Sequence, residues 1–509
     1  MLHVVGVVLF LVVLGTAVAT FARRWGIPAP SLLVLAGIAV ALVPGVPGVH
    51  VAPDVIALVV LPPLLYASAE EISVRALRRV WAPVLVLALG LVLATAAVIA
   101  SLALALTALS ASMAFVLGAV LASTDPVAVT ALGRRLSLPG RIQVLVQSES
   151  LFNDATSLVL FKVAVAGAVA GSVGVLGSVG KFFVLAGGGI GVGLAVAAVV
   201  GVLRSRTADP VLQTVIALIT PYCAYLLGES IDVSGVTAVV VAGVAVGSLG
   251  DRITDAGTRL HVQSVYAVVV FGLESVVFSL IGLELPTLVR DLGRGNGWWP
   301  AQAALLAAAL IGTRVLWVWP TTAAARSALG YPRWPLTRVV TWAGTRGVMP
   351  LAAALSIPLV ADDGAPLPGR PLVLVLTTAV VAATLTVQGL SLAGIVKTSG
   401  LAIAPEHTAA KETAAREAMD RAVVEYLDDL AAVGGMNPVA VQRLRSRYAE
   451  RLDPDTDAAL LDDLATLRRD VLSVQAAELR RLVAEERIGD GMRRRLQAEL
   501  DRREAGLDA

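Results

Sequence analysis

The chain has 509 residues, of which 57% are hydrophobic and only 15% are charged. Soluble domains usually carry about a quarter charged residues, so this composition excludes an ordinary soluble protein and favours one that crosses a membrane several times. The single cysteine, Cys223, excludes an intrachain disulfide.

Charge divides the chain into two regions. Residues 401–509 hold 17 basic and 22 acidic residues, a net charge of −5, whereas residues 1–400 have a net charge of +7. We therefore expect a transmembrane domain over 1–400 and a soluble helical tail over 401–509. The basic residues of the tail are interleaved with acidic ones, as on solvated helices, so we expect no nucleic-acid partner.

A membrane-spanning helix needs about 20 mostly apolar residues. Segmenting the chain at charged or Pro/Gly-rich breaks predicts an all-α polytopic membrane protein with thirteen transmembrane helices. The first starts near Leu2 without a basic stretch or a small-residue cleavage site, so we expect it to be retained and not removed as a signal peptide. The thirteen segments are 3–22, 28–43, 52–68, 82–107, 111–133, 141–170, 177–203, 210–228, 233–250, 261–285, 298–326, 336–360 and 370–397.

The connections between these segments predict an orientation, because cytoplasmic loops are enriched in Lys and Arg. The odd-numbered connections carry 15 arginines, and the even-numbered ones only Lys181, Arg290, Arg294 and Arg370. This alternation predicts an external N-terminus and a cytoplasmic tail. For the tail we expect a small helical bundle or a coiled-coil surface, with a regulatory role as the alternative.

Polar side chains within the apolar segments are the candidates for function, because a charge at the bilayer centre costs about 2.5–3.5 kcal/mol on insertion scales. In SESLFNDATSLVLF, residues 148–161, helical spacing puts Ser150 and Asp154 on one face, and Glu149 and Asn153 on the adjacent stripe. Such an oxygen-rich strip suits a hard cation. The alternative is polar contact between helices, which we favour for Ser150 taken by itself.

A helix interruption is predicted in LASTDPVAVT, residues 121–130. Pro126 removes a hydrogen-bond donor beside Thr124 and Asp125. The carbonyl groups freed there can bind a cation, and the ends of the half-helices present opposite partial charges. The alternative is a plain proline kink, satisfied by Thr124 and water.

A second interruption is predicted in WAGTRGVMPLAAAL, residues 342–355, where two glycines and a proline surround Arg346. The alternative for Arg346 is a side chain at the end of a loop that extends toward the headgroups. Arg314 also lies within an apolar segment and has no acidic neighbour in sequence. We expect it to pair with a carboxylate on another helix, with Glu149 as the candidate.

The two interrupted helices are the fifth and the twelfth of thirteen. If the seventh helix is a linker, the interrupted helix is the fifth in each of two six-helix halves. Interruptions at matching positions indicate an inverted-repeat transporter that binds its substrate near the middle of the membrane.

These segments resemble the monovalent cation/proton antiporters, in particular bacterial sodium/proton exchangers of the cation:proton antiporter-1 type, which are related to animal sodium/hydrogen exchangers. The resemblance covers about residues 1–400 and implies thirteen helices, two inverted six-helix repeats, unwound helices that cross, and a homodimer. The blocks that carry it are LPPLLYASA (61–69), LASTDPVAV (121–129), SESLFNDATSLVLF (148–161), VSGVTAVVVAGVAVG (233–247) and TRGVMPLAAALSIP (345–358).

The resemblance also implies an ion-binding site. Asp154 matches the ion-binding aspartate of the family, and Ser150 and the Thr124 backbone match oxygens of the cation site, so sodium is expected at these three residues. Asn153 matches its partner in the Asn-Asp pair that marks the electroneutral branch.

Further charged residues match supporting positions in the family. Glu149 matches the acid that pairs with an arginine, here Arg314, and Asp125 and Arg346 match charges at the helix crossing. The chain departs from the pattern at Gln147–Ser148, where many relatives have Glu-Gly. This departure removes one acid and bears on cation attraction or the response to pH.

The expected function is electroneutral exchange of sodium for protons across the cell membrane, in which Asp154 holds either ion in turn. The first alternative is the same exchange with potassium or lithium as the main ion. Others are a cation channel gated by the tail, and an intramembrane protease with Asp125 and Asp154 as its acid pair, for which no motif positions a substrate. We expect no enzyme activity and no cofactor; the partners are the transported ions, the lipid bilayer and a second copy.

Overall fold

The computed structural model divides the chain into two compact units, Met1–Ile403 and Ala404–Ala509. Its described residues are helical, apart from turns, short connections and an isolated bridge between Val360 and Pro366. They comprise residues 2–25, 29–43, 52–72, 74–125, 139–169, 175–207, 209–253, 256–292, 297–324, 333–362, 364–401, 405–433, 437–452, 475 and 481.

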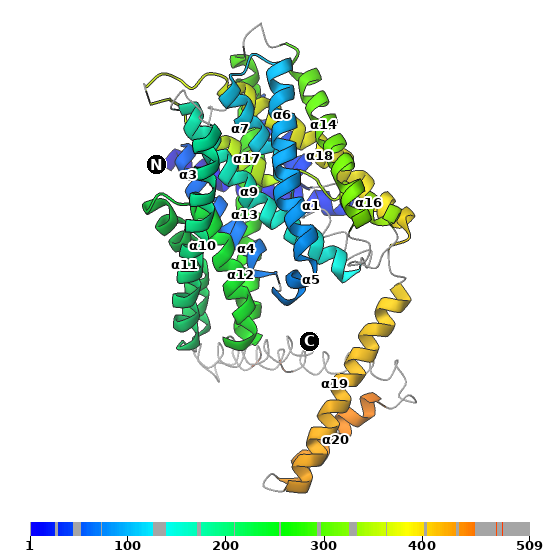
Figure 1. Cartoon of the computed structure of the whole chain (residues 1–509). Coiled ribbons are helices and arrows are strands. Elements are labelled where there is room, and N and C mark those ends of the chain that lie inside the picture. The colour runs from blue at the N-terminus through cyan, green and yellow to red at the C-terminus, as the bar shows by residue number, and fades with distance from the viewer. Residues whose placement is uncertain are drawn as a thin grey trace. The chain divides into compact units, whose positions relative to one another are not determined.

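The first unit consists of helices that are mostly apolar (Figure 1). In chain order they are α1 (Leu2–Trp25), α2 (Ala29–Ala41), α3 (Pro53–Val59), α4 (Leu61–Glu70), α5 (Val74–Leu85), the π-helix η1 (Val86–Leu91), α6 (Val92–Leu106), α7 (Ala111–Ala122), α9 (Gly140–Val169), α10 (Val175–Ser205), α11 (Pro210–Ser230), α12 (Gly235–Ile253), α13 (Ala256–Asp291), α14 (Trp299–Ala324), α16 (Arg333–Trp342), α17 (Val348–Leu355) and α18 (Arg370–Ser399).

Among the described residues, eight segments are long and apolar enough to cross a membrane, and four shorter apolar helices accompany them. Each of these twelve overlaps one of the thirteen predicted segments. The remaining predicted segment, 336–360, is divided between α16 and α17. Membrane-spanning helices are therefore present as expected, while the count of thirteen crossings stays a prediction.

Several helix ends differ from the prediction. The segment predicted at 52–68 is divided at Val60, because Pro62 and Pro63 lie in the first turn of α4, where a missing N–H breaks no helical hydrogen bond. α5 begins at Val74, eight residues before the predicted start, because its arginines lie on the polar face of an amphipathic helix. α13 continues through Pro286 to Asp291.

The helices of the first unit pack into two bundles. α1–α4 pack with α10–α13 and are termed the scaffold bundle; α5–α7, η1, α9, α14 and α16–α18 pack with one another and are termed the site bundle. Figure 1 shows α10, α11 and α12 on one side of this unit and α14 and α16 on the other. Each bundle takes helices from both halves of the transmembrane region.

Glycines let helices of the scaffold bundle approach closely. Gly37 of α2 and Gly282 of α13 face each other, and a Cβ atom at Gly282 would overlap the carbonyl of Val34. Small residues of this kind allow close backbone packing between helices in lipid, where burial of apolar surface gives little driving force.

Two extended segments meet inside the site bundle. Ser123–Asp125 follow the end of α7 without helical structure, and residues 343–347 separate α16 from α17. The Asp125 amide donates to the Thr345 carbonyl at 2.8 Å, and the Thr345 hydroxyl donates to the Asp125 carbonyl at 2.8 Å. These bonds satisfy backbone groups that the interrupted helices leave free. Pro126, which predicts the first interruption, lies outside the described residues.

The second unit contains α19 (Pro405–Val433) and α20 (Pro438–Leu452), which pack against each other. Arg445 of α20 donates to both carboxylate oxygens of Asp428 on α19. This hydrogen bonding holds the pKa of the Asp428 carboxyl below its ordinary value. The tail helices predicted at 456–486 and 489–505 lie outside the described part of the chain, apart from two residues.

Candidate functional site

The four polar residues of the predicted strip lie on α9, an uninterrupted helix of 30 residues. All four side chains are buried: Glu149, Ser150, Asn153 and Asp154 are exposed by 1%, 2%, 1% and 7%. Buried polar groups need partners, and these partners divide the strip. Three of the side chains engage the segment at the end of α7, whereas Glu149 engages Arg314 of α14.

Asp154 lies beside the interruption that follows α7. The hydroxyl of Ser123, the first residue after α7, donates a hydrogen bond to Asp154 Oδ1. Asp125 and Arg346 interact electrostatically with the same carboxylate. The carboxylate of α9 is thus near both interrupted segments, the position that the sequence predicts for it.

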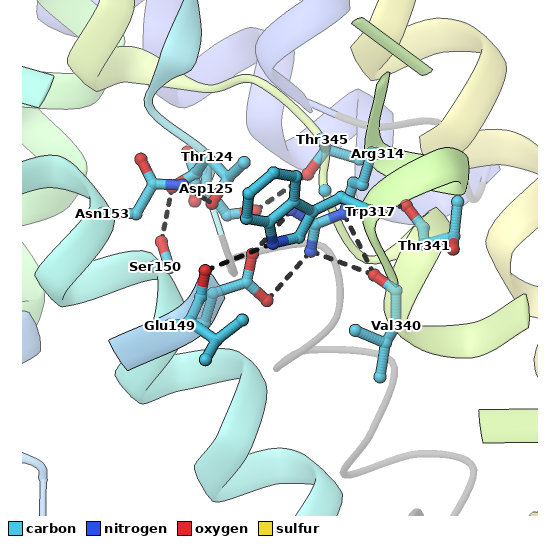
Figure 2. A network of polar contacts seen from close by, with 12 residues as sticks. Thr124, Asp125, Glu149, Ser150, Asn153, Arg314, Trp317, Val340, Thr341 and Thr345 are labelled. Carbon is cyan, nitrogen blue, oxygen red and sulfur yellow. Dashed lines mark hydrogen bonds and ion pairs between the residues drawn. The ribbon is translucent and has the colours of Figure 1, made fainter. Parts of the chain in front are cut away.

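Thr124 is held to α9 by two hydrogen bonds (Figure 2). Ser150 Oγ donates to the Thr124 carbonyl, and Asn153 Nδ2 donates to the Thr124 hydroxyl at 3.2 Å. Asn153 Oδ1 is a buried acceptor that has no hydrogen-bond donor among the described residues. The carboxamide therefore anchors the extended segment through its nitrogen and presents an unused oxygen.

Glu149 forms a buried ion pair with Arg314 of α14 (Figure 2). Arg314 Nη2 donates to Glu149 Oε2 at 2.9 Å; Nη1 lies 2.6 Å from Oε1 but is not aligned as a hydrogen bond. The guanidinium also donates to the carbonyls of Val340 and Thr341 near the end of α16, at 3.0–3.2 Å. The sequence predicts the pairing of Arg314 with Glu149, and the structure adds that Arg314 also links α9 to the second interrupted segment.

Arg346 links the two interruptions. It is 3% exposed, its Nε donates to the Leu121 carbonyl at 2.7 Å, and its Nη1 donates to the Gly344 carbonyl at 3.0 Å. The alternative of a side chain extending from a loop toward the headgroups is therefore wrong. A cation beside the C-terminal carbonyls of α7 also complements the dipole of that helix.

The structure thus places six of the predicted residues at the interruptions and the other two, an ion pair, next to the second one. Thr124, Asp125, Ser150, Asn153, Asp154 and Arg346 meet at the interruptions, whereas Glu149 and Arg314 pair with each other. The assembled oxygens come from a carboxylate, hydroxyls, a carboxamide and a carbonyl, the donor types that hard cations prefer.

Two acidic residues of the first unit are missing from the prediction. Glu274 and Glu284 lie on the apolar helix α13, where Glu274 interacts electrostatically with Asp125 and Glu284 with Arg370. The pattern that indicates Asp154 is a carboxylate inside an apolar run, and Glu274 and Glu284 show the same pattern.

Lys162 makes a polar contact between the two bundles that the sequence does not predict. Its Nζ, on α9, lies 2.5 Å from Glu229 Oε2 at the end of α11 and 3.2 Å from the Val233 carbonyl. Glu229 Oε1 in turn accepts a hydrogen bond from the Gly235 amide at the start of α12, at 3.1 Å. The helix that carries Asp154 is therefore tied to the scaffold bundle two turns further along.

Comparisons with known proteins identify the family and the fold of the chain. The family model described as the transmembrane sodium/hydrogen exchanger matches residues 7–398. An uncharacterized Na+/H+ exchanger of Mycobacterium tuberculosis (strain H37Rv) is 33% identical over 520 residues, which cover 97% of this chain and 94% of that protein. The sodium, potassium, lithium and rubidium/H+ antiporter of Bacillus pumilus is 32% identical over 378 residues, 70% of this chain and 56% of that protein.

Among solved structures, the chain is similar to the sodium proton antiporter MjNhaP1 from Methanocaldococcus jannaschii at pH 8. The TM-score is 0.64, with 21% sequence identity, and the match covers 79% of this chain and 98% of that one. At this identity the similarity shows a shared fold.

Proposed function

The chain belongs to the sodium/hydrogen exchanger family, a family of transmembrane transporters, and on this premise we propose that it exchanges sodium for protons at Asp154. The observation that carries the proposal is the position of this carboxylate. It is buried on a continuous helix, contacts Ser123 and lies within electrostatic range of Arg346, so it borders both interrupted segments.

In the proposed mechanism Asp154 holds either a proton or a sodium ion, never both. Ser150 and the Thr124 carbonyl complete the sodium site, and the unused Asn153 Oδ1 supports a further oxygen contact. Only the loaded site, with its charge neutralised, crosses the membrane interior cheaply, because an unpaired buried charge is costly. Movement of the site bundle against the scaffold bundle exposes the site to each side in turn.

The exchange is proposed to be electroneutral. One carboxylate that trades one proton for one sodium ion moves no net charge, provided that no second acid titrates with it. The Glu149–Arg314 ion pair supports this stoichiometry, because Glu149 already has a buried cationic partner. Glu149 is therefore proposed to stay ionised and paired with Arg314, and to take no part in the exchange of ions.

The proposed architecture has thirteen transmembrane helices in two inverted six-helix repeats, and a homodimer in the plasma membrane. Its N-terminus is external, residues 1–400 form the exchange domain, and residues 401–509 form a cytoplasmic helical tail, for which a regulatory role is the alternative to a purely structural one. Two features support the repeats: each bundle draws helices from both halves of the chain, and the interruptions after α7 and between α16 and α17 meet each other.

A second candidate is the same exchange with potassium or lithium as the main ion. The Bacillus pumilus relative supports it, because its name includes sodium, potassium, lithium and rubidium. Oxygen ligands suit all of these cations. Competition among the three cations for exchange in proteoliposomes separates the two candidates.

The test of the proposed function is sodium-driven proton movement in proteoliposomes that contain the full chain. Asp154→Asn keeps the shape of the side chain but removes its charge, so we expect exchange to be lost. The matched control is Asp232→Asn, an exposed residue with φ of 57°, a conformation that Asn also tolerates. Exchange that persists in Asp154→Asn contradicts the assignment, and a flux that depends on an imposed membrane potential contradicts one-for-one exchange.

A further inference from the structure

Ser123 is a buried hydroxyl residue at the end of α7 to which the family resemblance assigns no role. It follows the last helical residue with φ −63° and ψ 142°, and its side chain is 2% exposed. In this extended conformation its hydroxyl reaches across to α9, 31 residues further along the chain, and donates to Asp154 Oδ1. Ser123, at the interruption that follows α7, therefore contacts the Asp154 carboxylate directly through a hydrogen bond.

The oxygens of the neighbouring Thr124 already have donors. Its carbonyl accepts from Ser150, and its hydroxyl accepts from Asn153. Within the described part of the chain, no hydrogen bond is donated to the Ser123 oxygen. Because a serine hydroxyl has one proton to donate and two lone pairs, this oxygen retains its capacity as an acceptor.

A hydroxyl that donates to a carboxylate lies close to any cation that the carboxylate binds. When a cation binds to Asp154, rotation about the C–O bond of Ser123 turns the lone pairs toward the ion. The side chain then changes from hydrogen-bond donor to ligand without movement of the backbone. Its place beside Asp154 Oδ1 distinguishes it from Ser279 of α13, a fully buried serine whose hydroxyl has no partner in the described structure.

We propose that the hydroxyl of Ser123 is a ligand of the transported cation and sets the preference of the site for smaller cations over potassium. Cation selectivity depends on the size of the cavity and the number of ligands around it. An additional oxygen close to Asp154 raises the affinity for sodium and lithium more than the affinity for potassium, because the smaller ions lie closer to their ligands. This inference rests on the proposed function, because it requires cation binding at Asp154.

The experiment compares three variants of the full chain in proteoliposomes by their apparent KM for sodium, lithium and potassium. For Ser123→Ala we expect the KM for sodium and lithium to rise about tenfold, and that for potassium less than about threefold, with kcat retained. Ser123→Thr keeps the hydroxyl and should preserve the wild-type preference. Ser279→Ala removes a buried hydroxyl of α13 that makes no hydrogen bond to Asp154, and should leave all three values unchanged.

A further variant keeps the test decisive if Ser123→Ala folds poorly. Ser123→Cys has a similar shape but presents sulfur, which is a poor ligand for hard cations, so it should raise the sodium KM as Ala does. Unchanged KM values in Ser123→Ala or Ser123→Cys overturn the inference, as does an equal rise for all three ions. Failure of the proposed function gives a different result: exchange is then absent from the wild-type chain, or it persists in Asp154→Asn.

Discussion

The carboxylate of Glu149 and the guanidinium of Arg314 form an ion pair in which the two side chains are exposed by only 1% and 3%. Removing one partner of such a pair leaves an uncompensated charge away from water, at a cost of about 3–5 kcal/mol. Replacing both partners by neutral groups avoids that cost. The pair therefore links α9 and α14 in a way that single and double substitutions can distinguish.

We expect Arg314→Met to lower the stability of the purified protein by about 3–5 kcal/mol, because Glu149 is left as an unpaired buried charge. Its thermal unfolding in detergent should move to a clearly lower temperature. The double variant Glu149→Gln with Arg314→Met should recover part of the loss. A single variant that unfolds at the wild-type temperature would show that the ion pair contributes no stability.

Gly347 tests the contact between the two interrupted segments. A Cβ atom at this position would overlap the carboxylate of Asp125, so Gly347→Ala should displace the segment and lower stability by about 1–3 kcal/mol. We expect sodium-driven exchange to fall with it. The matched control is Gly312→Ala on α14, where a Cβ atom meets nothing within 4 Å. Equal behaviour of the two variants in thermal unfolding and exchange would refute this contact.

The ion pair between Lys162 and Glu229 tests movement between the bundles. Its side chains are 37% and 32% exposed, so Lys162→Met should cost no more than about 1 kcal/mol of stability. If the bundles move against each other during exchange, this contact must break, and its removal should raise turnover about twofold. Lys162→Arg keeps the charge and serves as the control. Wild-type turnover in Lys162→Met would mean that the contact does not restrain the movement.

The tail offers a test of pH dependence outside the membrane. Arg445 holds the pKa of Asp428 below its ordinary value, so the ion pair stabilises the α19–α20 pairing at neutral pH. This stabilisation is lost as the pH falls below the ordinary aspartate pKa of about 3.9 and through the lowered value. Hydrogen exchange of α20 in the full chain, corrected for its intrinsic pH dependence, should rise in that window. Asp428→Asn should show the higher exchange already at pH 7, and a flat response in both chains would contradict the pairing.

The sequence predicts the helices of the transmembrane unit and the sites of interruption well, because apolar runs and the charges within them follow directly from the cost of burial in lipid. Asp154, Asp125 and Arg346 are all found by this reasoning. Helix ends are less predictable: Pro286 does not end α13, and the arginines of α5 lie within the helix. Charged and proline residues are tolerated near the ends of membrane helices, so they mark boundaries only loosely.

The individual contacts at the site require the structure. The sequence puts Glu149 and Asp154 on neighbouring stripes of α9. Tertiary packing determines that Glu149 pairs with Arg314 and that Asp154 bonds to Ser123. Ser123 lies in the predicted interruption but carries no signal of its own, because a serine beside a helix can equally bond the backbone of that helix. Lys162 and Glu229 lie 67 residues apart, and their contact depends on how the two bundles pack.

The most direct test of exchange at a single carboxylate is the number of protons released when sodium binds to the purified protein. Calorimetry in buffers of different ionisation enthalpy measures this number at a pH where the site is protonated. If one carboxylate holds either ion, the wild-type chain should release one proton for each sodium ion bound, and Asp154→Asn should release none. Sodium binding without proton release in the wild-type chain, or equal release in Asp154→Asn, would contradict competition at Asp154.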